Sequence, residues 1–213
     1  MAKKPSAPKS GAGKGGAKDI ETRLVDAMLS LVETEGWRGT TVAGIAHAAG
    51  VPLSDLHPKY GSRLAIVAAY MRRIDRAVVT ADFGFGPEDS ARDRLFEVMM
   101  RRFDALRLHR EALRRIRAGI MADPPAALAL LPVIGCSMAW TLEAAEIPSD
   151  GASGGLKAAG LTAVWGKTLQ VWLEDETPDL ARTMAALDRN LGRASRVAEV
   201  LFGRRGRPTA EAA

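Results

Sequence analysis

The feature that most constrains this chain is a tight turn, Gly50-Val51-Pro52, between two short apolar segments. The segment before the turn has apolar residues at helical spacing up to Ile45 and Ala49, and Thr40 or Thr41 provides an N-cap. Glycine readily adopts the left-handed backbone that ends a helix. The pattern therefore predicts a helix-turn-helix, in which a second short helix crosses the first and can enter a DNA major groove about 12 Å wide.

Helical periodicity continues through the rest of the chain, and no strand pattern competes with it. We therefore expect an all-α protein, and its aromatic content of only 5% suits packed helices. The expected helices cover residues 19–35, 42–49, 53–60, 63–81, 90–106, 109–121, 124–145, 156–173 and 179–202. Residues 124–145 are nearly all apolar, which predicts a central, buried helix.

The net charge of +5 lies at the two ends of the chain. Residues 1–18 contain five lysines and no acidic residue, and the last ten residues contain three arginines and one glutamate. The segment between them has 22 basic and 24 acidic residues. We expect disordered basic arms at 1–18 and 204–213. Between them we expect two folded domains, at 19–66 and 67–203.

The residues around the turn resemble the DNA-binding domain of the TetR family across residues 19–70. The motifs that carry the resemblance are Thr40-Thr41-Val42, Ile45-Ala46, Ala49-Gly50-Val51, Leu56, Tyr60 and Ser62-Arg63. The resemblance implies a dimeric all-α protein whose N-terminal helix-turn-helix domain binds a double-stranded operator. The DNA contacts that it implies are Thr41, Ser54, His57, Lys59, Tyr60 and Arg63. Thr41 at a helix N-terminus is placed for a phosphate.

The expected recognition segment departs from the family pattern. His57 stands where a phosphate-contacting tyrosine is expected, and Arg63 replaces a lysine. Pro58 lacks an N–H late in the helix, and Asp55 has the wrong charge for a phosphate. Residues 19–63 have four basic and six acidic side chains. Because phosphate neutralisation supplies most DNA affinity, this domain alone is expected to bind DNA weakly.

The basic ends could supply the missing charge. Lysine-rich N-terminal arms of this kind reach across the backbone into a neighbouring minor groove. Arg205-Gly206-Arg207-Pro208 resembles the core of an AT-hook, although a basic tail that increases solubility explains the same residues.

The family resemblance also implies a ligand-holding, dimerising body at 67–203 with a small hydrophobic effector. The candidate pocket residues are soft or large side chains, which at this spacing equally suit a plain core. They are Met99, Phe103, Met138, Trp140 and Trp165.

A second resemblance leaves an alternative open. The segments 161–165, 172–179 and 187–191 are similar to the C-terminal part of ubiquinone-biosynthesis accessory proteins. Those proteins reuse the TetR fold to hold isoprenoid lipid and have lost DNA binding. On that alternative, the N-terminal helices of this chain are structural.

Enzymatic chemistry finds little support in the sequence. The histidines and the single cysteine show no metal-ligand spacing, and no phosphate loop or nucleophile motif appears. We expect no metal or cofactor, and a capping role for the acidic residues at 174–179.

Cys136 is expected to be a buried thiol. No run appears long and apolar enough to insert stably in a membrane. The sequence thus predicts a cytoplasmic, homodimeric TetR-type repressor, with the lipid-binding accessory protein as the alternative.

Overall fold

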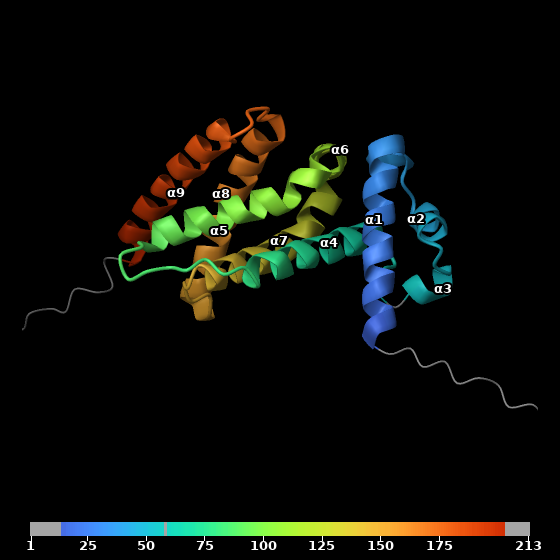
Figure 1. Cartoon of the computed structure of the whole chain (residues 1–213), viewed down its shortest axis with the longest axis horizontal. Coiled ribbons are helices and arrows are strands. Elements are labelled where there is room, and N and C mark those ends of the chain that lie inside the picture. Colours follow the sequence, from blue (N-terminus) through green and yellow to red (C-terminus); the bar gives the residue numbers. More distant parts are fainter. Residues whose placement is uncertain (1–13, 58, 203–213) are drawn as a thin grey trace, which may run out of the picture. The chain divides into compact units, whose positions relative to one another are not determined.

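The computed structural model describes residues 14–57 and 59–202, in which every regular element is helical (Figure 1). The chain divides into two compact units, and the boundary between Ala69 and Tyr70 falls inside a single helix, α4 (Arg63–Val79). Unit 1 contains α1 (Lys14–Gly39), α2 (Val42–Ala49), α3 (Leu53–Leu56) and the start of α4. The sequence had placed this boundary three residues earlier, between 66 and 67.

Unit 2 contains the rest of α4 and the remaining helices. These are α5 (Ala91–Leu106), the short 3-10 helix η1 (Arg107–His109), α6 (Arg110–Met121), α7 (Pro124–Ala144), α8 (Gly151–Glu174) and α9 (Ala181–Phe202). The expectation of an all-α chain is therefore confirmed for the described residues.

Unit 1 is built around α1, whose apolar stripe is completely buried. Leu24, Met28 and Val32 recur at four-residue spacing and have no exposed surface, and Ile45 of α2 and Ile66 of α4 are equally buried. This spacing places the three α1 side chains on one helix face, which is the face that the other helices cover. Helix α1 begins at Lys14, so residues 14–18 of the expected disordered arm are helical, and its regular backbone is interrupted at Gly36 (φ 75°, ψ 168°), directly after the expected end at residue 35. The segments 1–13 and 203–213, which hold most of the expected basic arms, lie outside the described residues.

Of the two threonines expected to cap the second helix, Thr41 does so, and other helices also begin or end at local caps. The Thr41 hydroxyl accepts a hydrogen bond from the Gly44 amide at 3.0 Å and caps α2. Gly50 ends that helix with a positive φ of 61°, a left-handed conformation that costs glycine little. Ser90 caps α5 and Asp123 caps α7, each through its side-chain oxygen.

Unit 2 packs its helices around a group of aromatic side chains. Phe103 of α5 stacks on Trp165 and Trp172 of α8, with ring centroids 5.0 and 5.6 Å apart. All three residues are buried, as are Met99 and Met138. Helix α8 packs against both α7 and α9. Large rings of this kind bury much apolar area each and so account for a large share of the stability of this core.

Helix α7 is not the buried central helix that its composition predicted. Its apolar residues lie all around the helix, but α5, α6 and α8 cover only part of it. Leu128, Leu131 and Trp140 are at least half exposed. Cys136 is also exposed, so the expected buried thiol is wrong, because this residue lies one helical turn from Trp140 on the uncovered side.

Helix α7 also corrects the expectation that no run reaches membrane-spanning length. Its 21 residues are long and apolar enough to cross a membrane by length and composition. Those two properties alone do not distinguish a spanning helix from a core helix that is partly covered.

Candidate nucleic-acid interface and effector cavity

The second helix of the helix-turn-helix is a single turn. Helix α3 ends at Leu56, whereas the sequence predicted a helix to residue 60. After it, the amides of Lys59 and Tyr60 both donate to the Leu56 carbonyl, at 3.1 and 2.7 Å. Pro58, which lies outside the described residues, has no N–H to continue a helix and restricts the residue before it. The predicted recognition segment is thus one helical turn followed by a hydrogen-bonded turn.

Four of the six expected DNA contacts are exposed, namely Thr41, Ser54, His57 and Lys59. The Ser54 hydroxyl donates to the neighbouring Asp55 carboxylate at 3.2 Å, so this serine is already engaged with an acidic group. His57 follows α3 directly. The four side chains come from the start of α2 and from the α3 segment, the two places where a helix-turn-helix meets DNA.

The other two expected contacts, Tyr60 and Arg63, form hydrogen bonds with groups of unit 1 itself. Tyr60 is only 4% exposed, and its hydroxyl donates to the Glu21 carboxylate at 2.8 Å. Lys59 pairs with the same oxygen at 3.3 Å while its chain stays exposed. Burial raises the pKa of the Tyr60 hydroxyl, so it stays protonated and can donate. The three residues tie the segment after α3 to α1.

Arg63 is the second of these two contacts. Its guanidinium donates to the carbonyls of Trp37 and Thr40 and lies 4.5 Å from the centre of the Trp37 ring. Arg23 does the same at the end of α2, where it donates to the carbonyls of Ala49 and Gly50. Both arginines therefore satisfy carbonyl groups at or beside helix ends, where the backbone leaves acceptors without partners.

These contacts leave fewer basic side chains of residues 19–63 available to DNA than the count of charges in the sequence indicated. Of the four basic side chains in residues 19–63, Arg23, Lys59 and Arg63 bind groups of unit 1 itself, and the fourth is Arg38. Sequence reasoning missed this because the partners lie 23 to 38 residues away along the chain.

A buried polar network in unit 2 was also missed. Arg102 of α5 is 2% exposed, and its guanidinium binds the Asp75 carboxylate at 2.7 Å and the Ser137 hydroxyl at 2.5 Å. Ser137 in turn donates to Asp75 at 2.5 Å. Burial lowers the pKa of Arg102, while Asp75 acts in the opposite direction and supports the charged form. The network joins α4, α5 and α7 through one buried charge pair.

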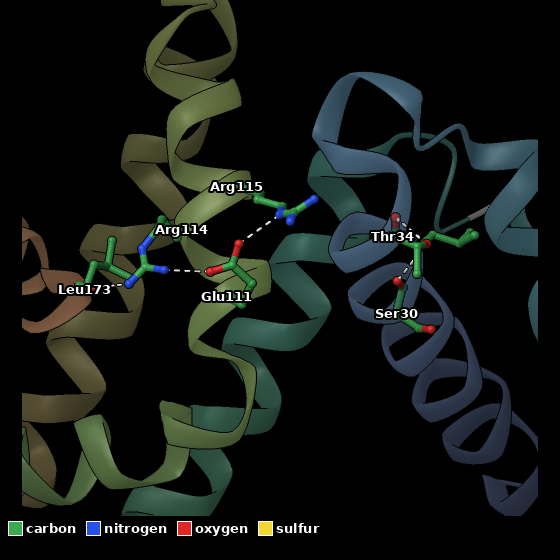
Figure 2. A network of polar contacts seen from close by, with 7 residues as sticks. Ser30, Thr34, Glu111, Arg114, Arg115 and Leu173 are labelled. Carbon is green, nitrogen blue, oxygen red and sulfur yellow. Dashed lines mark hydrogen bonds and ion pairs between the residues drawn. The ribbon is translucent and has the colours of Figure 1, made fainter. Parts of the chain in front are cut away.

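Helix α6 uses its arginines in a similar way (Figure 2). Glu111 accepts hydrogen bonds from Arg114 at 2.6 Å and Arg115 at 2.9 Å, and Arg114 also donates to the Leu173 carbonyl of α8. The hydrogen bond from Arg115, with help from Arg114, lowers the pKa of Glu111. The basic run of α6 is therefore partly a structural contact with the end of α8.

The acidic segment between α8 and α9 is a helix cap, as expected. Asp175 is fully buried and accepts from the amides and hydroxyls of Thr177 and Thr183, at 2.6 to 3.1 Å. Burial alone would raise its pKa, but the four hydrogen bonds outweigh it and lower the pKa to about 2. Asp179 also accepts from the Ala181 amide at the start of α9.

Unit 2 contains an apolar groove with a volume of about 470 Å³. Residues of α5, α8, α9 and the end of α7 line it, among them Leu95, Leu142, Leu161, Val164 and Leu191. None of the five residues expected to line a ligand pocket contributes to this groove. Met99, Phe103, Met138 and Trp165 are buried in the core, and Trp140 is 53% exposed.

No family model and no curated protein matches the chain, but its structure is similar to solved structures. A TetR transcriptional regulator from Nitrosomonas europaea ATCC 19718 matches with a TM-score of 0.63 and 20% identity, over 83% of this chain and 98% of the other. A TetR transcriptional regulator from Rhodococcus sp. RHA1 gives 0.58 and 18%, over 84% and 96%.

A putative TetR-family transcriptional regulator from Rhodococcus sp. gives a TM-score of 0.52 and 21% identity, over 84% of this chain and 98% of the other. The likeness spans both units and nearly the full length of each of the three neighbours. The chain therefore has the fold of the TetR transcriptional regulators.

Proposed function

We propose that this protein is a TetR-type transcriptional regulator, a cytoplasmic homodimer that represses by binding operator DNA through unit 1. The observation that carries the proposal is the capped α2, ended by left-handed Gly50 and followed at once by α3, within a TetR-like fold. Unit 2 holds a hydrophobic effector that changes operator affinity. In this proposal the protein is a binding protein, without a cofactor or a catalytic step.

The exposed residues are the DNA contacts in this proposal. Ser54 presents its side chain to base edges, and Thr41, His57 and Lys59 contact phosphates. Tyr60 and Arg63, which the sequence placed in the same group, position the α3 segment through Glu21 and through the carbonyls of Trp37 and Thr40. Their removal therefore weakens unit 1 rather than a single base contact.

Most of the phosphate neutralisation comes from the ends of the chain. Residues 1–18 hold five lysines and the last ten residues hold three arginines, whereas residues 19–63 are net acidic. Each neutralised phosphate steepens the salt dependence of binding by about 0.9 in the log-log slope. Deleting residues 1–18 and 204–213 should therefore weaken binding and make that slope shallower.

Fluorescence anisotropy with the upstream DNA of the gene, over a range of salt concentrations, tests the proposal. The variant His57→Ala should bind that DNA several-fold more weakly, because a hydrogen bond to a charged group is worth about 1.5–3 kcal/mol. The matched control is His47→Ala, an exposed histidine of α2 that is not among the candidates. Equal binding of upstream and random DNA by the intact protein would contradict the proposal.

A second candidate function is a lipid-binding accessory protein of ubiquinone biosynthesis in which unit 1 is structural. Two observations favour it. Helix α3 has only four residues, and the basic groups of Arg23, Lys59 and Arg63 bind carbonyl or carboxylate groups of unit 1 itself. Mass spectrometry of co-purifying lipid separates the two functions. Bound isoprenoid with no DNA preference supports the accessory protein, and a palindromic footprint released by a small molecule supports the regulator.

A further inference from the structure

The groove in unit 2 has an uneven charge distribution. Four of its lining residues are cations, Arg92, Lys157, Lys167 and Arg193, and none of its lining residues is acidic. The remaining lining is mostly aliphatic. A soluble ligand for such a groove needs a large apolar part and a negative charge.

Two of these cations already have partners. Arg92 forms an ion pair with Asp188 at 2.7 Å, and Lys157 donates to the Pro148 carbonyl at 3.2 Å. Lys167 and Arg193 are exposed and make no hydrogen bond or ion pair with any residue that the structure describes. These two side chains are therefore the ones that can bind a ligand without first losing a contact.

Lys167 and Arg193 lie near the same end of the groove. The Asn190 amide, another lining group, donates to Thr168 on α8 at 3.2 Å, which brings this part of α9 beside Lys167. Arg193 follows Asn190 by about one helical turn. Leu156, an exposed apolar lining residue, lies 11 residues before Lys167 on α8, roughly 16 Å away along the helix. The cation at that end is Lys157, which already donates to the Pro148 carbonyl, so the two cations without a partner in the described part of the chain lie at the opposite end of the groove.

We propose that this groove binds a single-chain amphiphile with an anionic headgroup. The headgroup contacts Lys167 and Arg193, and the apolar tail runs past Gly160 toward Leu156. A groove of about 470 Å³ falls within the range of about 300–1,000 Å³ for small-molecule sites. Lysine and arginine form charge-assisted hydrogen bonds with a carboxylate, whereas a neutral or cationic headgroup leaves them unmatched.

Charge also distinguishes this occupant from a second copy of the chain. A symmetric pairing through this surface would bring a second Lys167 and a second Arg193, which have no acidic partner among the described residues, to the interface, and like charges repel. The inference rests on the proposed function, since it names the chemistry of the effector of unit 2. Its test is nevertheless made without DNA.

Calorimetric titration of the full-length protein compares three probes at concentrations at which each stays monomeric in solution: dodecanoate, 1-dodecanol and dodecylamine. The tails are the same and only the headgroup charge differs. We expect dodecanoate to bind one molecule per chain, dodecanol to bind about tenfold more weakly, and dodecylamine to bind more weakly still. Equal affinity of dodecanoate and dodecanol would overturn the proposal.

Two glycines of α8 provide a matched pair for the tail. A Cβ built at either Gly160 or Gly166 meets no atom within 4 Å, so both positions accept a larger residue, but only Gly160 lines the groove. Gly160→Phe should abolish dodecanoate binding, and Gly166→Phe should leave it unchanged. Circular dichroism checks that both variants keep the helical content of the wild type. Unchanged binding by a folded Gly160→Phe protein would overturn the proposal.

A second pair of variants tests the headgroup and does not depend on the glycines. Lys167→Met with Arg193→Met should weaken dodecanoate roughly tenfold or more and leave dodecanol unchanged, which removes the preference between them. The control is Arg189→Met with Arg196→Met, two exposed arginines of α9 outside the groove. A preference that persists in the first pair would contradict the assignment of the headgroup.

Light scattering identifies the competing occupant. If dodecanoate does not bind and Gly160→Phe instead changes the oligomeric state, a second copy covers the groove and the proposal fails. Anisotropy with upstream DNA is measured separately. DNA preference without dodecanoate binding overturns this inference alone, and dodecanoate binding without DNA preference overturns the regulator alone.

Discussion

The two units of this protein use their basic side chains in different ways. In unit 1, Arg23, Lys59 and Arg63 bind carbonyl or carboxylate groups of the same unit and hold the ends of helices. In unit 2, Lys167 and Arg193 project at a groove that has no acidic lining. A count of charges along the chain does not distinguish these situations. What decides whether a cation is available to a ligand is whether the fold has already given it an acceptor.

The largest expected effect concerns the buried pair of unit 2. Arg102→Ala leaves the Asp75 carboxylate without its counter-charge, and removal of one partner of a buried pair typically costs about 3–5 kcal/mol. We expect the free energy of unfolding, measured in urea, to fall by that amount. Arg101→Ala, at the exposed neighbouring position, is the control and should change it by less than about 0.5 kcal/mol. A similar change in the free energy of unfolding for both variants would contradict the structural role of the Arg102–Asp75 pair.

The next effect depends on pH and concerns Asp175. Its pKa in the folded protein is about 2, below the usual value of about 3.9 for an unfolded chain. The carboxylate therefore stabilises the fold above about pH 4, by about 2–3 kcal/mol, and this contribution is lost as the pH falls toward 2.

Urea unfolding of wild type and Asp175→Asn at pH 5 and pH 2.5 measures this contribution. The two proteins should differ most at pH 5 and converge at the lower pH. Asp179→Asn, at an exposed position of the same segment, is the comparison and should show little pH dependence. A difference between wild type and Asp175→Asn that is the same at both pH values would contradict the assigned cause.

In unit 1, Arg63→Ala should lower the free energy of unfolding by about 1.5 kcal/mol, because the Trp37 and Thr40 carbonyls lose a charged donor. Arg63→Lys should recover only part of it, since an ammonium does not match the flat guanidinium over the Trp37 ring. Thermal unfolding and DNA anisotropy are measured on the same samples. Full stability with weakened DNA binding would instead make Arg63 a DNA contact, as the sequence predicted.

The smallest effect should come from Tyr60→Phe, which removes the hydroxyl that binds Glu21 and keeps the buried ring. A loss of about 1 kcal/mol is expected, because Lys59 still pairs with the glutamate. The salt slope of DNA binding should stay that of the wild type. A changed slope would show that Tyr60 reaches phosphate despite its burial.

The sequence predicted the elements of this fold better than their surroundings. Thr41, Gly50 and Ser90 act through their own helices, so their roles follow from local spacing. The length of α3 was overestimated because the apolar period continues to Tyr60, whereas Tyr60 belongs to the turn that follows. The partners of Arg63 and Arg102 could not be predicted, because no local pattern indicates contacts over 23 to 35 residues.

The candidate effector site shows the same limit. The predicted residues were the largest and softest side chains, and most of them fill the core instead. The groove is lined by small, aliphatic and basic residues from four helices, and this kind of surface has no signature along the chain. Which face of α8 or α7 stays uncovered depends on the number and position of its neighbours, and composition alone does not contain that information.

The exposure of Cys136 gives the protein a single chemical handle. The chain has one cysteine, so any disulfide that it forms must join two molecules, and a thiol-reactive dye attaches at one defined place. That place is the uncovered apolar side of α7, one turn from the half-exposed Trp140. A dye there, with Trp140 beside it as a natural quencher, would report whatever molecule comes to cover this helix.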